Sequence, residues 1–194
     1  MEATEDPEQD KQVAIIIFVM AIAGMCVNLF VLIFIQQIDS IRKPFVQTSV
    51  SQMIADFTVL FTFAAYAAPR TFFNDMEVLK NTTLNRFMGQ LNITAYVACI
   101  YTHLLRSTCR FMAISLPIRH SRIFTQRNTI AALFLVWLFA ALQTLIHFFG
   151  GFSEGCAFTY VVDQYGFMYS DTTCGMAIKL VIDFAQYLIV ILFV

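Results

Sequence analysis

Three basic side chains share one stripe of an apolar segment near the middle of the chain. His103, Arg106 and Arg110 are spaced i, i+3 and i+7, which places them along one face of an α-helix. Together with Asp56 they offer groups that acid–base chemistry uses, but no nucleophile, phosphate loop, CxxC or HExxH spacing accompanies them. We therefore expect the protein not to be an enzyme, and we expect no metal or cofactor site.

The chain around this stripe is far more apolar than a soluble domain. Of its 194 residues 59% are hydrophobic, 13% are charged and 21 are phenylalanines, whereas soluble domains average about 45–50% apolar and about 25% charged residues. A net charge of -1 does not supply the concentrated basic face that a nucleic-acid partner needs. The composition therefore predicts a membrane protein with no nucleic-acid partner.

Five apolar runs predict an all-α membrane protein built as a transmembrane helix bundle. The first run has no charge and is long enough to cross a hydrocarbon core of roughly 30 Å. Residues 1–12 form an acidic tail, unlike the basic start of a secretory signal, so we do not expect cleavage. The predicted helices, which together form one domain over 13–194, lie at about 13–36, 48–68, 89–113, 129–149 and 175–194.

The charges between these runs predict the orientation of the chain. The first short loop contains Arg42 and Lys43, whereas the long loop over 150–174 has three acids and neither Lys nor Arg. Loops rich in Lys and Arg remain in the cytoplasm, so we expect the first and third loops inside and the N-terminus outside. The basic residues of the third loop are Arg119, Arg122 and Arg127.

Two glycosylation sequons favour the same orientation. Asn81 begins NTT and Asn92 begins NIT, both in or near the loop that should lie outside. Asn92 is expected close to the membrane, where modification is hindered. Arg70, Lys80 and Arg86 in the same region count against the orientation.

Polar side chains inside the spans should face the bundle, because exposure to hydrocarbon is costly. Asn28 and Asp56 should lie at similar depths and form a hydrogen bond, which would clasp two helices whether or not it has a dynamic role. Arg106 lies one turn deeper than Arg110, about 6 Å by helical rise, and needs an acceptor. Asp56 is the first candidate, and snorkelling to lipid phosphates is the alternative. His103 is either a satisfied core histidine or a proton switch.

Other polar and aromatic residues are candidates for the wall of an outer cavity. Lys179 and Asp183 are spaced i, i+4 in the last run, so they either pair within one helix or line such a cavity. Trp137 lies mid-span, which indicates packing against a neighbouring helix. Further candidates for ligand contact, equally open to plain packing, are Tyr96, Tyr101, His147 and Tyr160.

The cysteines divide by compartment. Cys26 and Cys99 fall inside spans, and Cys109 lies near the reducing cytoplasm. Cys156 and Cys174 belong to the long outer loop, where a disulfide is chemically permitted. We expect this pair to form a bridge that folds the loop into a lid.

Taken in order, these features resemble a rhodopsin-type G-protein-coupled receptor. The matching positions are Asn28, Asp56 in SQMIADF, CRF followed by AISLP, and Trp137. Three segments resemble the nematode serpentine receptor class X, a group of chemosensory receptors. They are HLLRSTCRFMAISLPIRHSRIFT, CAFTYVVDQYGFMYSDTTC and IDF. The resemblance covers essentially the whole chain and corresponds to the first five of seven helices.

The resemblance implies a chemosensory receptor that senses an extracellular small molecule or peptide and signals through a heterotrimeric G protein. The arginine that matches Arg110 would hold the cytoplasmic helix ends closed and then meet Gα, and the polar core would comprise Asn28, Asp56 and Arg106. The implied location is the plasma membrane, with the ciliary membrane of sensory neurons as one candidate. The expected coupling residues are Arg110, Phe111, Pro117, Arg119 and Arg122.

The chain departs from this pattern in three ways. Cys109 replaces the acid usual before the arginine, no cysteine occurs at the outer start of the third span, and the sequence ends in the fifth span. We therefore expect a truncated form. The alternatives are a five-helix partner that modulates full-length receptors, a nonfunctional product, or a small transporter lined by the intramembrane charges. The lack of inverted repeats counts against the transporter.

Overall fold

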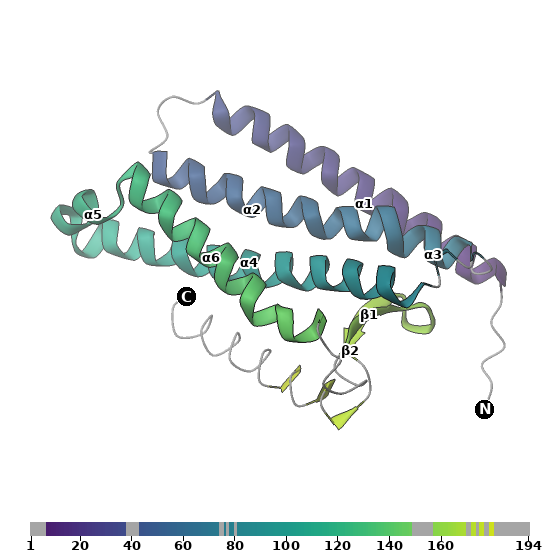
Figure 1. The fold of residues 1–194 in the computed structure, drawn as a ribbon. Helices are drawn as coiled ribbons and strands as arrows, with labels where there is room; N and C mark the ends of the chain where they lie inside the picture. Colours follow the sequence, from purple (N-terminus) through teal and green to yellow (C-terminus); the bar gives the residue numbers. More distant parts are fainter. Residues whose placement is uncertain are drawn as a thin grey trace.

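Long helices that run alternately in opposite directions make up most of the molecule (Figure 1). This arrangement confirms the predicted helix bundle. The computed structural model describes residues 7–37, 43–73, 76, 78–79, 81–148, 157–169, 172–173, 175–176 and 179–180. The four long helices are α1 (Pro7–Gln36), α2 (Lys43–Thr62), α4 (Thr82–Ser115) and α6 (Gln126–Phe148).

The second helix continues beyond α2 through a wide turn. A π-helical segment, η1 (Phe63–Ala67), joins α2 directly to α3 (Ala68–Phe72). Pro69 has no amide hydrogen for the carbonyl one turn back, and the wider turn directly before it accommodates its ring. The turn directs Tyr66, which is 1% exposed, into the interior.

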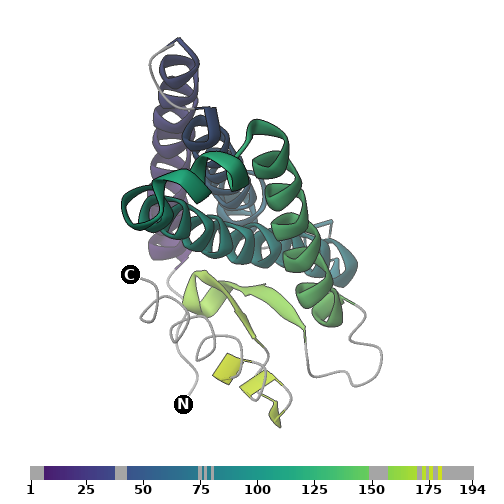
Figure 2. The same ribbon diagram turned by 90° about the vertical axis from the view of Figure 1, so that its left-hand side faces the viewer.

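Two small elements mark the opposite ends of the bundle (Figure 1), and Figure 2 looks along the bundle from the end that carries the short helix. A short helix, α5 (Pro117–Ile123), lies at one end, which we call the α5 end. A two-stranded antiparallel hairpin, which the all-α prediction did not include, lies at the other, the hairpin end. It consists of β1 (Phe158–Val161), the 3-10 turn η3 (Val162–Gln164) and β2 (Gly166–Tyr169).

Small residues and aromatic rings form the interior. Ala14 and Ala21, buried on α1, allow that helix to pack closely on α2 and α3. Trp137 on α6 packs against the buried cluster around Val97 and donates a hydrogen bond to Ser51 Oγ on α2 at 3.0 Å. The predicted packing of Trp137 against a neighbouring helix is therefore confirmed.

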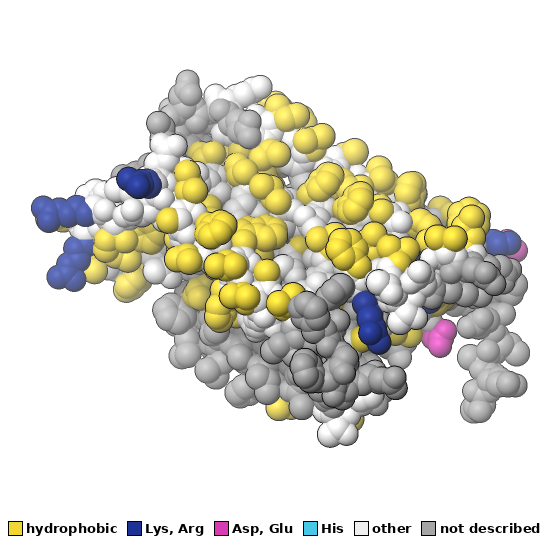
Figure 3. Space-filling model, in the orientation of Figure 1, with side chains coloured by type: hydrophobic (Ala, Val, Ile, Leu, Met, Phe, Trp, Pro, Cys, Tyr) yellow, Lys and Arg dark blue, Asp and Glu magenta, His cyan; other side chains and the backbone are white. Residues whose placement is uncertain are grey.

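Three described helical segments are long and apolar enough to cross a membrane, and Figure 3 shows a broad apolar surface between the two ends. α4 coincides with a predicted span but is not one of the three. It lies between α2 and α6, and several of its polar side chains bond to those neighbours, as when Asn92 donates to Thr62 and Gln90 donates to Thr144. The three segments are Glu8–Ile35, Pro44–Phe72 and Gln126–Leu145.

The helices begin earlier than their apolar runs. α1 starts at Pro7, so half of the expected acidic tail is helical; Glu8 and Asp10 lie in its first turn, where negative charge favours the helix dipole. α4 starts at Thr82, because the Asn81 side chain accepts hydrogen bonds from the amides of Thr83 and Leu84. Polar caps therefore extend both helices beyond their apolar cores.

Candidate functional site

A line of contacts, the α2–α4 seam, joins these two helices over the part that lies nearer the α5 end. Cys99 on α4 donates through Sγ to Oδ1 of Asp56 on α2 at 3.4 Å. One turn closer to the α5 end, Gln52 Nε2 donates to Nε2 of His103 at 2.6 Å. The predicted stripe on α4 therefore faces α2.

The seam continues to the α5 end with two arginines. Arg106 donates to Ser49 Oγ at 3.3 Å, and its guanidinium carbon lies 5.6 Å from the ring centroid of Phe45. The guanidinium carbon of Arg110 lies 5.8 Å from the same centroid. A cation over an aromatic face is attracted to the electron-rich ring, so Phe45 holds both cations at the end of α2.

The seam has a matched spacing on its two helices. On α2, Gln52, Ser49 and Phe45 lie 4, 7 and 11 positions before Asp56. On α4, their partners His103, Arg106 and Arg110 lie 4, 7 and 11 positions after Cys99. Those offsets return to one face of an α-helix. Two antiparallel stripes therefore remain in register over about 16 Å of helix length.

This register corrects the expected partner of Arg106. Ser49 lies seven positions from Asp56, about 10 Å along α2, and Arg106 lies level with Ser49. Within the described part of the chain, Arg106 and Asp56 form no ion pair, and Arg106 Nε is buried without a hydrogen-bond partner. Nor does Asn28, half-buried on α1, form the expected hydrogen bond with Asp56 among those residues.

The α5 end presents the residues expected to couple to Gα. Arg110 is exposed, Phe111 is 66% exposed, and Pro117 is the first residue of α5. Arg119 and Arg122 project from exposed positions on α5. Figure 3 shows Lys and Arg side chains gathered at this end. The structure therefore places all five expected residues on one end of the bundle.

A thiol–imidazole contact joins α5 to α4. His120, only 7% exposed, places Nε2 3.4 Å from Cys109 Sγ and stacks on Phe124 with centroids 5.2 Å apart. Cys109 occupies the position before Arg110 at which the resemblance to rhodopsin-type receptors leads us to expect an acid. Its imidazole partner fixes which face of α5 turns inward and leaves the arginines outward.

The hairpin end is closed by contacts between β1 and the helices. The Tyr160 hydroxyl lies 2.7 Å from Thr71 Oγ1 on α3, and Asn85 on α4 bonds both the amide and the carbonyl of Tyr160, at 2.8 and 3.2 Å. A Cβ added at Gly89 would lie 1.9 Å from the Phe158 carbonyl oxygen. Burial raises the pKa of the Tyr160 phenol, although the Thr71 hydrogen bond opposes the shift.

Aromatic rings and one long contact complete the hairpin end. The Tyr66 and Phe63 rings pack with Tyr160 and Phe167 in a second buried cluster. Tyr165, whose φ is 49°, donates to Asp10 Oδ1 on α1 at 2.6 Å. The hairpin therefore contacts α1, η1, α3 and α4 together.

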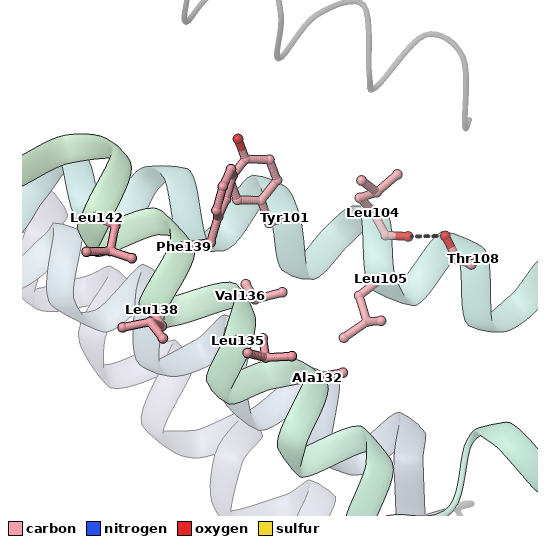
Figure 4. A pocket seen from close by; sticks show the side chains of 10 residues that line it. All are labelled: Tyr101, Leu104, Leu105, Thr108, Ala132, Leu135, Val136, Leu138, Phe139 and Leu142. Atoms are coloured by element: carbon pink, nitrogen blue, oxygen red, sulfur yellow. Dashed lines mark hydrogen bonds between the residues drawn. The ribbon is translucent and has the colours of Figure 1, made fainter.

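The candidate ligand residues that the structure describes do not gather in one outer cavity. Tyr160 is buried in the hairpin, Tyr96 is 46% exposed on α4, and Lys179 is exposed. Tyr101 instead donates to Gln143 Oε1 at 2.8 Å and lies on a groove between α4 and α6 (Figure 4). The His147 side chain, Asp183, Cys156 and Cys174 lie outside the described residues, so the ligand, salt-bridge and disulfide predictions for them stay predictions.

The two sequons differ. Asn81 is exposed at the start of α4, and its capping bonds use Oδ1, which leaves Nδ2 available for a glycan. Asn92 is 7% exposed, and its Nδ2 donates to Thr62 Oγ1 at 2.7 Å. Because a glycan joins through Nδ2 of an accessible asparagine, the packing of Asn92 opposes its modification, and glycosylation of the two sequons stays a prediction.

Several residues of the site were missed from the sequence. Phe45 follows Pro44 at the start of α2. The only sequence signal for its role was the absence of an acid beside Arg110, which indicates an uncharged partner for that cation. Asn85 and Thr71 are ordinary polar residues, although the alternation in FTYV before a turn ending in Gly166 is typical of a hairpin. Among the described side chains, no group of three His, Cys, Asp or Glu could hold a metal ion.

Comparison with known proteins adds two matches. A family model described as "Serpentine type 7TM GPCR chemoreceptor Srx" matches residues 18–194. Serpentine receptor class X 45 of Caenorhabditis elegans is 31% identical over 129 residues, which covers 66% of this chain. The aligned region spans 36% of that relative.

Proposed function

Because the chain belongs to the serpentine 7TM chemoreceptor family Srx, an integral membrane family of receptors rather than enzymes, we propose that it senses an extracellular ligand and signals through a Gα subunit. The observation that best supports signalling is the state of Arg110. It is exposed at the end of the α2–α4 seam and held by the Phe45 ring at 5.8 Å. Among the described residues no acid pairs with Arg110, so a partner can bind this cation without first breaking a salt bridge.

The charge of the α5 end supports the orientation of the proposal. Residues 110–127 include Arg110, Arg119, Arg122 and Arg127, and no acid. A segment of this kind remains in the cytoplasm during membrane insertion. The α5 end then faces Gα, and the hairpin end and the N-terminus face outside at the plasma membrane.

α4 supplies a physical link between the two ends, and the seam holds the part of α4 nearer the α5 end against α2. A ligand at the hairpin end would contact α4 and β1, and α4 extends from there to Arg110. The cation–aromatic contact at the far end is worth about 0.5–2 kcal/mol, small enough to be exchanged for a contact with Gα. A ligand would favour that exchange only by its differential affinity for the two arrangements.

The test uses the full-length transcript product that contains this chain, expressed with Gα subunits. The measured quantity is nucleotide exchange on Gα above that of mock-transfected cells. Arg110→Ala is expected to abolish the increase and to leave surface delivery mostly unchanged, because the side chain is exposed. Arg127→Ala, which changes an exposed arginine at the start of α6 outside the five expected coupling residues, is the matched control and should retain exchange. Normal exchange by Arg110→Ala would overturn the proposal.

A further inference from the structure

The contact between Cys109 and His120 has a chemistry that the proposed signalling function does not use. The Cys109 sulfur and the His120 Nε2 are 3.4 Å apart, and His120 is held by burial and by its stack on Phe124. An imidazole nitrogen at this distance can take the thiol proton. The product is a thiolate, which is the nucleophilic form of cysteine.

The location of Cys109 indicates which reaction its thiolate is expected to undergo. Cys109 lies near the end of α4, where the apolar helix meets the arginine-rich segment that begins at Arg110. Cysteines at such a membrane boundary are the ones that accept long-chain acyl groups. An acyl chain attached here would enter the hydrocarbon layer directly.

An apolar groove between α4 and α6 ends at Thr108, the chain neighbour of Cys109. Its volume is about 600 Å³, within the range of about 300–1,000 Å³ usual for small-ligand pockets. Thr108, the neighbour of Cys109, and Leu105, one helical turn back on the same face, line it from α4. Ala132 and Leu135 line it from α6, and the groove continues to Tyr101 (Figure 4).

We propose that Cys109 is a site of S-acylation by a long-chain fatty acid, with the acyl chain lying in the groove between α4 and α6. The Cys109 thiolate attacks the carbonyl carbon of an acyl-coenzyme A thioester. A new carbon–sulfur bond forms to Cys109, the bond to coenzyme A breaks, and the coenzyme A thiolate recovers the proton held by His120. The proposal rests on the proposed cytoplasmic orientation of the α5 end but not on Gα coupling.

The other described cysteines lack this combination. Cys26 is exposed on α1 ten positions before the helix ends, and Cys99 donates to Asp56 at the end of the α2–α4 seam that lies farthest from the α5 end. Neither has a hydrogen bond to a histidine among the described contacts. Both cysteines therefore serve as controls for a label specific to Cys109.

The experiment expresses the full chain in cultured animal cells that are fed an alkyne-bearing palmitate analogue. Label should appear, be released by neutral hydroxylamine as a thioester is, and map to the tryptic peptide 107–110. Cys109→Ser should reduce it to background, whereas Cys26→Ser and Cys99→Ser retain it. His120→Asn, which keeps a polar ring-sized group but is a poorer proton acceptor, should lower the labelling rate several-fold.

A pair of adjacent alanines tests the groove. Ala132→Trp fills the groove from its α6 wall and should reduce the labelled fraction, whereas Ala131→Trp changes an exposed position that does not line the groove and should not. Equal effects of the two substitutions would place the chain elsewhere.

Two further outcomes separate the possible failures. Label that survives Cys109→Ser, or a Cys109 adduct released by dithiothreitol but not by hydroxylamine, overturns the proposal. Glycosylation of Asn81 in the same cells reports the orientation independently. Absence of label with a glycan at Asn81 overturns acylation alone, and absence of both overturns the shared orientation as well.

Discussion

The guanidinium carbon of Arg110 lies 5.8 Å from the ring centroid of Phe45, across the boundary between α4 and α2. Arg106, one turn deeper, lies at a similar distance from the same ring. An aromatic face therefore takes the place that an acid would occupy beside Arg110. Such a contact is weaker than a desolvated ion pair and leaves no charge behind when it breaks.

Phe45→Leu should lower the thermal stability of the purified chain by about 0.5–2 kcal/mol, because leucine keeps an apolar side chain but removes the ring beneath both arginines. The measurement is thermal unfolding in detergent. Phe57→Leu, at a 42% exposed position on the same helix with no cation over its ring among the described residues, is the control. Equal losses in the two variants would show that the ring contributes only apolar area.

Gly89→Ala should displace the hairpin, because the new Cβ would lie 1.9 Å from a backbone oxygen of Phe158 that cannot rotate away. We expect a loss of about 1–3 kcal/mol and faster proteolytic cleavage within residues 157–169. Gly24→Ala is the matched control, since its Cβ would meet the flexible end of Leu60 at 2.8 Å. A Gly89→Ala chain as protease-resistant as the parent would contradict the close approach.

Asn81→Gln should remove a glycan, seen as a faster-migrating band that enzymatic deglycosylation no longer shifts. Asn92→Gln should leave that shift intact, because Asn92 is buried and its amide is bonded to Thr62. Disturbing this buried hydrogen bond should instead cost about 1–3 kcal/mol of stability. A glycan at Asn92 would mean that α4 is not packed against α2 when the chain is modified.

Tyr160 should make the hairpin end sensitive to alkali. Burial raises the pKa of its phenol above the ordinary value of 10.0, so the folded chain favours the neutral phenol more than the unfolded chain does. Its contribution to stability is therefore complete below the ordinary value of 10.0 and is lost as the pH rises above 10.0 through the raised pKa of the folded chain.

Thermal unfolding measured from about pH 8 to about pH 11 would show this loss. Tyr160→Phe should flatten the decline, while lowering stability at neutral pH because the hydroxyl contact with Thr71 is lost. An unchanged decline in Tyr160→Phe would assign the effect to other groups.

Much of the fold was predictable from the sequence because apolar runs mark helix interiors. The runs over 13–36 and 129–149 end within one residue of α1 and α6. The starts of α1 and α4 were missed, since polar residues such as Glu8 and Asn81 extend a helix by capping and dipole effects rather than by apolar periodicity.

The site was predictable as a stripe but not as a set of pairs. The spacing of His103, Arg106 and Arg110 indicates one face of a helix, and that face does meet α2. Which α2 residue contacts each of them depends on how far α2 and α4 are shifted along each other. The local sequence of neither helix determines that shift. A shift of two helical turns separates the expected partner Asp56 from the observed partner Ser49.

The two hydrogen bonds between the Asn85 side chain and the backbone of Tyr160 have a consequence for how copies of the protein can associate. A two-stranded hairpin has two free edges, and an unpaired edge is a template on which another chain can add a strand. The Asn85 side chain accepts a hydrogen bond from the backbone amide of Tyr160 and donates one to its carbonyl oxygen. At Gly89, α4 lies directly against the Phe158 carbonyl oxygen. One edge of the hairpin is therefore blocked against strand-to-strand aggregation by a single amide and a glycine.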